Sequence, residues 1–398
     1  KSYSHLIRAV APINVKAKKW VDGRKDSINF LSTHKIEGRV IWFHTASLGE
    51  FEQGKPVMEA FKKANPDWKL IITFFSPSGY DARKDYKMAE SVLYLPIENN
   101  SNISLFLDVV NPEIAVFVKY EFWYGYMENL ASRNIPLLFI SASFRENQVF
   151  FKWYGGWFLG LLKRSKFLFV QEESSKMLLD TKGLNQVEVS GDTRFDRVFD
   201  TFVKSESLPE VESFKGGDKI LIFGSAWEVE TDLSKIILQN LPKGWKIIYA
   251  PHEINKLNID KYRNDLTVPS VLFSEFNEKK VGNELVLIVD TIGHLARVYK
   301  YANVAIIGGG FSKMGIHNII EPAIFGLPVL YGPNDRDYPE SRALKAEKQA
   351  FQYEDVKELE KLIIKLISEK NSFESDYIKN NKKCSEQILK HLESDFGF

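Results

Sequence analysis

The sequence of 398 residues lacks several features that mark particular classes of protein. It contains one cysteine, Cys384, which excludes an internal disulfide framework or a cysteine-based zinc cluster and fits a reducing compartment. Its 53 basic and 52 acidic residues leave a formal net charge of +1. Because no strong charge of one sign is present, we expect no nucleic acid among the partners.

Common catalytic motifs are missing as well. No HExxH pattern or spaced set of Asp and His predicts a metal site, and the seven histidines are scattered. The lysine motif of nucleotide hydrolases and the GxSxG motif of esterases are both absent.

No uninterrupted apolar run reaches the roughly 20 residues of a membrane span, and no signal-peptide pattern is present. We therefore expect a chain that is not integral to a membrane as given. Because it begins with Lys1 rather than Met, a preceding hydrophobic anchor stays open.

The first 25 residues are basic and amphipathic. The basic residues face one acidic residue, Asp22, and are Lys1, Arg8, Lys16, Lys18, Lys19, Arg24 and Lys25. The interleaved apolar residues are Leu6, Ile7, Val10, Ile13 and Trp20. Two interpretations are equally open: the segment lies on an anionic membrane surface, or it is a solvated helix that packs on its own domain.

Short apolar runs alternate with longer amphipathic stretches such as 50–64, which predicts parallel sheets covered by helices. The predicted strands of a first series are 39–44, 69–75, 91–96, 113–118, 136–141 and 166–171, and those of a second series are 219–225, 245–251, 285–290, 303–309 and 327–332.

This alternation predicts two doubly wound α/β domains, a fold class that suits the chain length. We expect a first domain at 1–200, a polar linker at 201–218 that carries Pro209, a second domain at 219–375, and a helix at 376–398 that could pack back on the first domain. Ligands of such domains bind at the carboxyl ends of the strands, here across a cleft between the two domains.

Polar segments follow the predicted strands, as this expectation requires. They are HTASLGE (44–50), KYEFW (119–123), GSAWE (224–228), APHE (250–253) and GGGFSKMGIHN (308–318). In the last segment we expect Gly308 to Gly310 to end a strand and Gly315 to Asn318 to open a helix. Free backbone N–H groups there would hold an anionic phosphate.

These segments, in this order together with TFFSPSGYDA, YLPIEN, SASFRE, GDTRFDR, DTIGHL and EPAIFGLPVLYGPN, resemble the Kdo transferases, which transfer 3-deoxy-D-manno-oct-2-ulosonic acid (Kdo) in lipopolysaccharide assembly. The resemblance covers essentially the whole chain. It implies a GT-B glycosyltransferase with two facing Rossmann-like domains, an N-terminal one for the acceptor and a C-terminal one for the donor.

The resemblance also implies the substrates and the location. The donor would be CMP-Kdo and the acceptor a lipid A precursor of the lipid IVA type, with inversion at the anomeric carbon and no metal or other cofactor. Family members act on the cytoplasmic face of the bacterial inner membrane, as peripheral or N-terminally anchored proteins. The number of sugars transferred stays open.

An inverting transfer needs a base for the acceptor hydroxyl, and Glu50 at the start of a predicted helix suits that role. Ser47 and Gly49 would let the acceptor approach. An ordinary helix-start carboxylate is the alternative for Glu50. Glu121 is a second candidate catalytic residue. Lys119 beside it stands where the family commonly has a glutamate; we assign it to acceptor binding, and it could bind a phosphate or the sugar carboxylate. A buried carboxylate paired with Lys119 or Arg145 is the alternative for Glu121.

The remaining candidates would bind the donor. They are Ser225, His252, Ile292, Gly293, Gly310, Gly315, His317, Asn318 and Glu321. The resemblance assigns Glu321 to the ribose and Ile292 and Gly293 to the nucleobase. Asn318 and Ser225 could equally be helix caps.

Beside His252 the family often has an arginine, which this chain lacks. Its phosphate contact would then pass to His252 itself, to Arg194 or to Lys256.

Two other functions stay open on the sequence. One is a non-catalytic binding or sensor protein for a nucleotide sugar, which would not need Glu50, and the other is a nucleotide-sugar epimerase, which would consume no acceptor.

Overall fold

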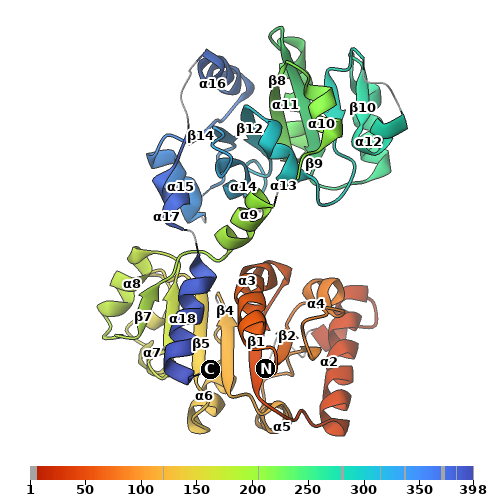
Figure 1. Ribbon diagram of the computed structural model, residues 1–398. Coiled ribbons are helices and arrows are strands. Elements are labelled where there is room, and N and C mark those ends of the chain that lie inside the picture. The colour runs from red at the N-terminus through yellow and green to blue at the C-terminus, as the bar shows by residue number, and fades with distance from the viewer. Residues whose placement is uncertain are drawn as a thin grey trace. The chain divides into compact units, whose positions relative to one another are not determined.

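The computed structural model describes residues 7–119, 121–204, 206–278, 282–313, 315–335, 338–368, 373–381 and 383–397. Lys1 and Leu6 of the basic segment, Tyr120 of KYEFW and Met314 of the glycine-rich segment lie outside these ranges. The chain forms two compact units (Figure 1). Unit 1 comprises Lys1–Asp196 and Lys383–Phe398, and unit 2 comprises Arg197–Lys382.

Unit 1 is built on a seven-stranded sheet in the order β3-β2-β1-β4-β5-β6-β7, in which all neighbouring strands are parallel. The strands are β1 (Val40–Thr45), β2 (Lys69–Phe74), β3 (Ser91–Tyr94), β4 (Ile114–Val118), β5 (Leu137–Ala142), β6 (Phe167–Val170) and β7 (Val187–Val189). The central strands β1, β4 and β5 are buried throughout, because helices cover both faces of the sheet.

The helices of unit 1 are α2 (Val15–Thr33), α3 (Leu48–Ala64), α4 (Pro77–Arg83), α5 (Asn100–Val110), α6 (Tyr124–Ser132), η1 (Val149–Phe151), α7 (Gly156–Leu162), α8 (Glu173–Asp180) and α18 (Cys384–Phe396). Alternate residues of β1 supply two cores. Trp42 packs on one face with Phe106 and Phe117, and Phe43 packs on the other face with Phe51.

The C-terminal helix α18 belongs to unit 1. Ile388 and Leu392 are fully buried in the core beneath α3, and in Figure 1 the blue α18 lies among the orange and yellow elements of this unit. The carboxylate of Asp196 accepts hydrogen bonds from the backbone N–H groups of Cys384 (3.0 Å) and Ser385 (2.5 Å). The last helix is thus fixed at its first turn and along its apolar face.

Helix α2 packs on its own unit. Trp20, Arg24 and Leu31 are buried, and Arg24 Nη2 donates to the carbonyl of Phe75 at 3.0 Å. Arg24 and Trp20 are therefore withdrawn from any membrane surface, contrary to the interpretation that counts them in a lipid-binding face. Ile13 and Val15 remain 88% and 76% exposed. No helix within the described ranges has both the length and the apolar character that crossing a bilayer requires.

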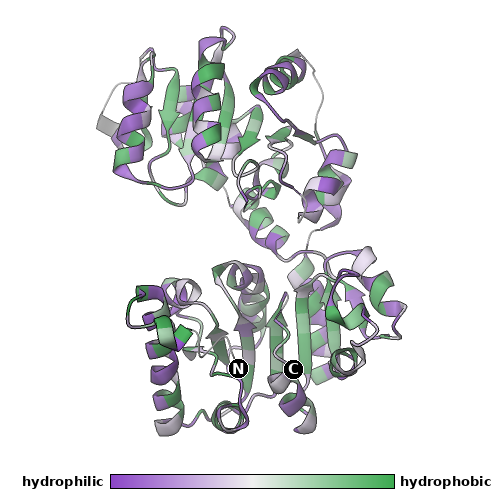
Figure 2. Ribbon diagram, turned by 180° about the vertical axis from the view of Figure 1, so that it is seen from behind, coloured by the Kyte–Doolittle hydropathy of each residue, from purple (hydrophilic) through white to green (hydrophobic). Residues whose placement is uncertain are grey.

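Unit 2 repeats the architecture with the parallel order β10-β11-β9-β8-β12-β13-β14. Its strands are β8 (Lys219–Ala226), β9 (Trp245–Pro251), β10 (Ser270–Leu272), β11 (Val286–Ile288), β12 (Val304–Ile307), β13 (Val329–Tyr331) and β14 (Ala350–Gln352). Figure 2 shows the strands of both sheets as mainly hydrophobic and the helices around them as mixed. The prediction of two Rossmann-like α/β domains with parallel sheets is confirmed.

The helices of unit 2 are α9 (Arg194–Val203), which spans the boundary, α10 (Pro209–Lys215), α11 (Glu228–Gln239), α12 (Lys256–Asp265), η2 (Phe273–Glu278), α13 (Leu295–Val298), η3 (Tyr299–Tyr301), α14 (Ile320–Ala323), α15 (Pro339–Ala346), α16 (Val356–Ser368) and α17 (Asp376–Asn380). The segment 201–218, expected to be a polar linker, includes α10. Its Val211 and Phe214 are fully buried, so this part of the segment packs as a helix of unit 2.

Candidate functional site

Near the centre of each sheet lies a point at which the strand order reverses. In unit 1 it lies between β1 and β4, and in unit 2 it lies between β8 and β12. The loops that leave the carboxyl ends of these two strands diverge and leave room for a ligand. Most of the candidate residues lie in these loops, so each unit is described from that point outwards.

In unit 1 a histidine and a glutamate meet at this point. His44 lies near the end of β1 and Glu121 follows β4, and the distance from His44 Nε2 to Glu121 Oε2 is 3.2 Å. Trp123 Nε1 donates to the same carboxylate oxygen at 2.7 Å. The Glu121 side chain is 14% exposed, whereas that of His44 is completely buried. Glu121 thus has a fixed position and one side that reaches solvent.

Glu50 lies at the third position of α3 and closes a capping box. Its Oε2 accepts a hydrogen bond from the Ser47 backbone N–H at 3.0 Å and a further one from the Ser47 hydroxyl. Gly49 leaves open space apart from Ser47 Oγ, 3.6 Å from where a Cβ would stand. The structure therefore joins Ser47 and Glu50 directly, and the capping alternative for Glu50 describes its present contacts.

Lys119 begins the loop after β4 in a left-handed backbone conformation with φ of 66°. Its N–H still donates to the Ile140 carbonyl at 2.9 Å, which continues the ladder with β5. Residues other than Gly and Asn rarely take this backbone conformation. The chain therefore turns sharply at Lys119 instead of continuing along the direction of β4.

In unit 2 the strand β8 is irregular at Ser225, which has φ of 51°, and the β8–β9 register shifts between Phe223 and Ala226. Gly308 at the end of β12 lies against this irregularity. A Cβ on Gly308 would stand 2.1 Å from the Ser225 carbonyl oxygen. Ser225 and the glycine-rich segment are therefore brought together, through their backbones.

The glycines of the segment 308–318 are packed against the chain itself. A Cβ on Gly310 would stand 2.6 Å from Gly332 Cα, and one on Gly315 would stand 2.7 Å from the Tyr338 ring. The backbone N–H groups of Gly315, Ile316 and His317 donate to the carbonyls of Ser312 (3.2 Å), Asn334 (3.2 Å) and Gly308 (3.0 Å) respectively.

The expectation of free N–H groups from Gly315 onwards is therefore wrong for Gly315, Ile316 and His317. The expected helix start is also wrong, because α14 begins only at Ile320 and has four residues. The segment forms a compact turn in which these three N–H groups are bonded to main-chain carbonyls. Of its side chains, that of His317 contacts the candidate His252.

Three rings form a stacked cluster after β8, β9 and β12. The centroid of Trp227 lies 4.5 Å from that of His252, which lies 4.4 Å from that of His317. Trp227 Nε1 donates to His317 Nε2 at 2.6 Å. Burial, with a smaller contribution from His252, lowers the pKa of His317 from 6.5 to about 4. His317 is therefore neutral near pH 7 and accepts the indole hydrogen.

Asn318 and Glu321 form a local pair. The Asn318 side chain accepts from the Ile320 N–H at 3.1 Å and donates to Glu321 Oε1 at 3.1 Å. It therefore contacts the first residue of α14, although the N-cap position of that helix is Ile319. Burial raises the pKa of the Glu321 carboxyl, and Arg197 and Asn318 oppose that shift. The carboxylate is oriented by Asn318 at the entry of α14.

Ile292 and Gly293 lie on the loop after β11. Ile292 is 88% exposed, and Gly293 has φ of 89° with open space at its Cα. The neighbouring His294 contacts Thr291 Oγ1 at 2.9 Å through Nδ1 and packs on Phe273. The loop offers a bare backbone and one exposed apolar side chain, which is a surface on which a flat ring could lie.

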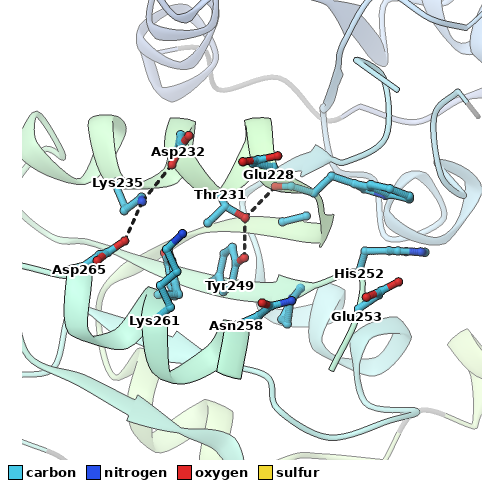
Figure 3. A pocket seen from close by; sticks show the side chains of 14 residues that line it. Glu228, Thr231, Asp232, Lys235, Tyr249, His252, Glu253, Asn258, Lys261 and Asp265 are labelled. Atoms are coloured by element: carbon cyan, nitrogen blue, oxygen red, sulfur yellow. Dashed lines mark hydrogen bonds and ion pairs between the residues drawn. The ribbon is translucent and has the colours of Figure 1, made fainter. Parts of the chain in front are cut away.

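A cavity of about 410 Å³ lies between α11 and α12, and His252 and Trp227 form one part of its wall. Figure 3 shows Lys235 between Asp232 and Asp265, at 2.9 and 3.2 Å, farther along the same wall. Of the candidate residues, His252 alone is among those that line this cavity. Lys261 also lines it, and no sequence signal pointed to Lys261.

The substitutes for the missing arginine differ in their contacts. Arg194 is held by Asp192, with Nε at 2.8 Å and Nη2 at 2.6 Å from Oδ2. Lys256 is exposed at the first position of α12. Within the described ranges, no group of three or more His, Cys, Asp or Glu could hold a metal ion.

Comparison with known proteins gives the family of the first half. Residues 22–197 match the model of the family described as 3-deoxy-D-manno-octulosonic-acid transferase (kdotransferase). The chain is a relative of the Kdo transferases. The Kdo transferase of Rickettsia bellii is 25% identical over 376 residues, which cover 91% of this chain and 88% of that protein.

A longer relative has a second activity in its name. The bifunctional glycosyltransferase/methyltransferase of Fusobacterium nucleatum is 24% identical over 362 residues, which cover 88% of this chain. The present chain spans 56% of that protein.

Among solved structures, UDP-GlcNAc 2-epimerase of Neisseria meningitidis bound to UDP-GlcNAc has a TM-score of 0.64 and 17% identity, and the match covers 90% of this chain and 100% of that one. That likeness shows the fold alone.

For this relative of the Kdo transferases, the sequence pointed to Glu121 without its partners. His44 and Trp123 were both inside quoted segments, and a histidine at the end of an otherwise apolar strand was the available signal. Trp227 was likewise quoted in GSAWE but was not assigned a role.

Proposed function

We propose that this protein transfers Kdo from CMP-Kdo to a lipid A precursor of the lipid IVA type, as an inverting and metal-independent glycosyltransferase of lipopolysaccharide assembly. The match of residues 22–197 to the Kdo transferase family carries the proposal. The carboxylates of Glu50 after β1 and Glu121 after β4 support it. A transfer to an alcohol needs a base and a group that orients the hydroxyl, both at one edge of the domain that binds the sugar acceptor.

Glu50 takes the proton of the acceptor hydroxyl in this proposal. Its place in the first turn of α3 keeps the carboxylate near the positive end of the helix dipole, which favours the ionised form that a base must have. The Ser47 hydroxyl, which now contacts Glu50, marks where the acceptor hydroxyl would bind. Gly49 and Lys119 would line the acceptor, and Glu121 would orient it.

Unit 2 binds the donor in this proposal. The stacked rings of His252, His317 and Trp227 and the pair of Asn318 and Glu321 lie after strands of the same sheet. Glu321 would accept from the ribose hydroxyls, and the loop at Ile292 and Gly293 would lie along the nucleobase. Ser225 and the turn at Gly310 and Gly315 shape the phosphate end. The proposal requires that both units reach the same substrates.

The protein would work at the cytoplasmic face of the inner membrane, as a peripheral or N-terminally anchored protein. The exposed Ile13 and Val15 support this, since they neighbour the basic Lys16 and Lys18 on one short stretch of the surface. Apolar side chains among basic ones suit an anionic lipid surface.

Mass spectrometry of the lipid product tests the proposal. The protein is incubated with CMP-Kdo and a tetraacylated disaccharide acceptor. The expected product is the acceptor with added Kdo, and one CMP is released for each Kdo added. Absence of any added sugar, with the protein folded and both substrates intact, contradicts the proposal.

The likeness of fold to an epimerase makes one further assay useful. An epimerase would convert UDP-GlcNAc without any acceptor, and a sensor would bind CMP-Kdo without turnover. We expect no change in UDP-GlcNAc, and release of CMP only when the lipid acceptor is present.

A further inference from the structure

A chain of polar side chains runs through the core of unit 1 beneath Glu121. Trp42, His44 and Thr73 are all completely buried. The register of the sheet brings them together, because His44 of β1 lies opposite Thr73 of β2, and Trp42 lies two residues earlier on the same face as His44. Buried polar groups in an otherwise apolar core need partners, and here each one contacts the next.

The distances define the order of the chain. Trp42 Nε1 lies 2.8 Å from Thr73 Oγ1, which lies 2.8 Å from His44 Nδ1. His44 Nε2 then lies 3.2 Å from Glu121 Oε2.

For an imidazole that carries one hydrogen, the donors and acceptors fix the direction of these hydrogen bonds. An indole N–H can only donate, so Thr73 Oγ1 accepts from Trp42. The single hydroxyl hydrogen of Thr73 then donates to His44 Nδ1, and the His44 hydrogen is on Nε2, where it donates to Glu121 Oε2. The reverse arrangement would place a lone pair of Nε2 against the carboxylate oxygen and would leave the Thr73 hydrogen without its acceptor.

We propose that His44 is a positioning residue for Glu121, and that Thr73 and Trp42 select the His44 tautomer that donates to it. This inference rests on the proposed function, in which Glu121 orients the acceptor. His44 and Trp123 both donate to Oε2, so Oε1 is left for the hydroxyl groups of the acceptor. Phe117 and Trp123 pack edge-to-face on the imidazole, with centroids at 5.6 and 5.7 Å, and hold the plane of the ring.

Substitutions at His44 separate a donor to Glu121 from mere filling of space. The amide nitrogen of a glutamine can reach the place of Nε2, whereas that of an asparagine is shorter and corresponds to Nδ1. We expect His44→Asn to lower kcat for Kdo transfer by about 100-fold and His44→Gln by about tenfold or less, since a lost hydrogen bond to a charged group costs about 10- to 100-fold. Binding of CMP should change in neither variant.

Thr73 offers a second matched pair. Thr73→Val keeps the branched shape but removes the hydroxyl, and Thr73→Ser keeps the hydroxyl. We expect kcat to fall about tenfold further in Thr73→Val than in Thr73→Ser. His34→Gln, at an exposed histidine on the surface of unit 1, is the control and should leave kcat unchanged. If His44→Asn fails to fold, as judged by its thermal unfolding, the Thr73 pair decides.

Nitrogen-15 NMR of the histidine side chains tests the tautomer without any turnover. We expect the His44 hydrogen on Nε2 and the Nδ1 signal shifted in Thr73→Val, with the His44 resonance identified by its loss in His44→Gln. A neutral His44 with its hydrogen on Nδ1 overturns the inference. So does full kcat in His44→Asn, which leaves the proposed transfer standing. If no transfer is detected in the parent protein, the proposed function fails, and the positioning role fails with it even if the tautomer is found.

Discussion

The two strand-order reversals carry the same residue types in different electrostatic settings. In unit 1 a buried histidine and a tryptophan both donate to one carboxylate, Glu121. In unit 2 a tryptophan, Trp227, donates to a histidine, His317, and a second histidine, His252, stacks on both rings. One sheet thus presents an oriented carboxyl group at its carboxyl edge, and the other presents stacked rings, of which His317 is neutral near pH 7.

This difference indicates a division of labour. The oriented carboxyl group of unit 1 suits the activation of a hydroxyl group. The ring cluster of unit 2 places no negative charge against a ligand that itself carries negative charge. We therefore expect changes in unit 1 to alter turnover and changes in unit 2 to alter donor binding.

The largest expected effect is at Glu50. Glu50→Gln should lower kcat by about 1000-fold, because the amide cannot take a proton, while the dissociation constant of CMP stays unchanged. Glutamine can still accept from the Ser47 N–H and close the capping box, so the melting temperature should be kept. Initial rates of CMP release and titration calorimetry measure the two quantities.

Glu50→Ala is the control for the cap. It should lose turnover and also some thermal stability, because it removes the carboxylate that accepts hydrogen bonds from both the N–H and the hydroxyl of Ser47. Undiminished transfer in Glu50→Gln would show that Glu50 is not the base, and would contradict the assignment of turnover to unit 1.

The next effect is at Glu321. Glu321→Gln should weaken CMP binding about tenfold, the usual size of a lost hydrogen bond to a charged group, and should leave kcat at saturating donor nearly unchanged. Calorimetry with CMP and with its 2′-deoxy analogue checks the ribose contact. If Glu321 meets the 2′-hydroxyl, the variant and the parent should bind the deoxy analogue equally. An equal loss with both ligands would argue against that contact.

A smaller effect concerns pH. The folded pKa of His317, about 4, lies below the ordinary 6.5, so between these values the unfolded chain binds a proton that the folded chain does not. Stability from this group should be complete above pH 6.5 and fall as the pH drops towards 4. Melting temperatures across this range should fall less in His317→Gln, which keeps an acceptor for Trp227. A His317 titration midpoint near 6.5 by NMR would contradict the lowered pKa of this histidine.

The smallest effect is at Ile292. Because its side chain is 88% exposed, Ile292→Ala should leave the melting temperature unchanged and weaken CMP binding by about threefold or less, from the apolar area lost against the base. Leu257→Ala, at another exposed apolar side chain of unit 2, is the matched control. Equal binding in both variants would remove the nucleobase from this loop.

Much of the fold could be predicted because every predicted strand range overlaps a strand of the structure, and β9 has the predicted bounds 245–251. The strands β7, β10 and β14 were not predicted. Each has three residues and lies at an edge of its sheet. The strands β11 and β13 are equally short, but they lie within the longer apolar runs 285–290 and 327–332, whereas β7, β10 and β14 have no such run around them.

The candidate site was harder to predict than the fold. The sequence could place Glu50 and Glu121 after strands, but the partner of Glu121 is 77 residues away, and the sheet register brings them together. The glycines at 308–310 show a second limit. They look the same in sequence whether a ligand or the main chain approaches, and here the main chain fills the space at Gly308 and Gly310.

The return of α18 to unit 1 has a consequence for how this protein is made. Unit 2 is in effect an insertion within unit 1, so the surface that packs against Ile388 and Leu392 stays uncovered until α18 has left the ribosome. A fragment that ends where unit 1 first ends, at Asp196, would present that surface to water. Unit 1 can begin to fold early, but α18 must be synthesised before its core is complete.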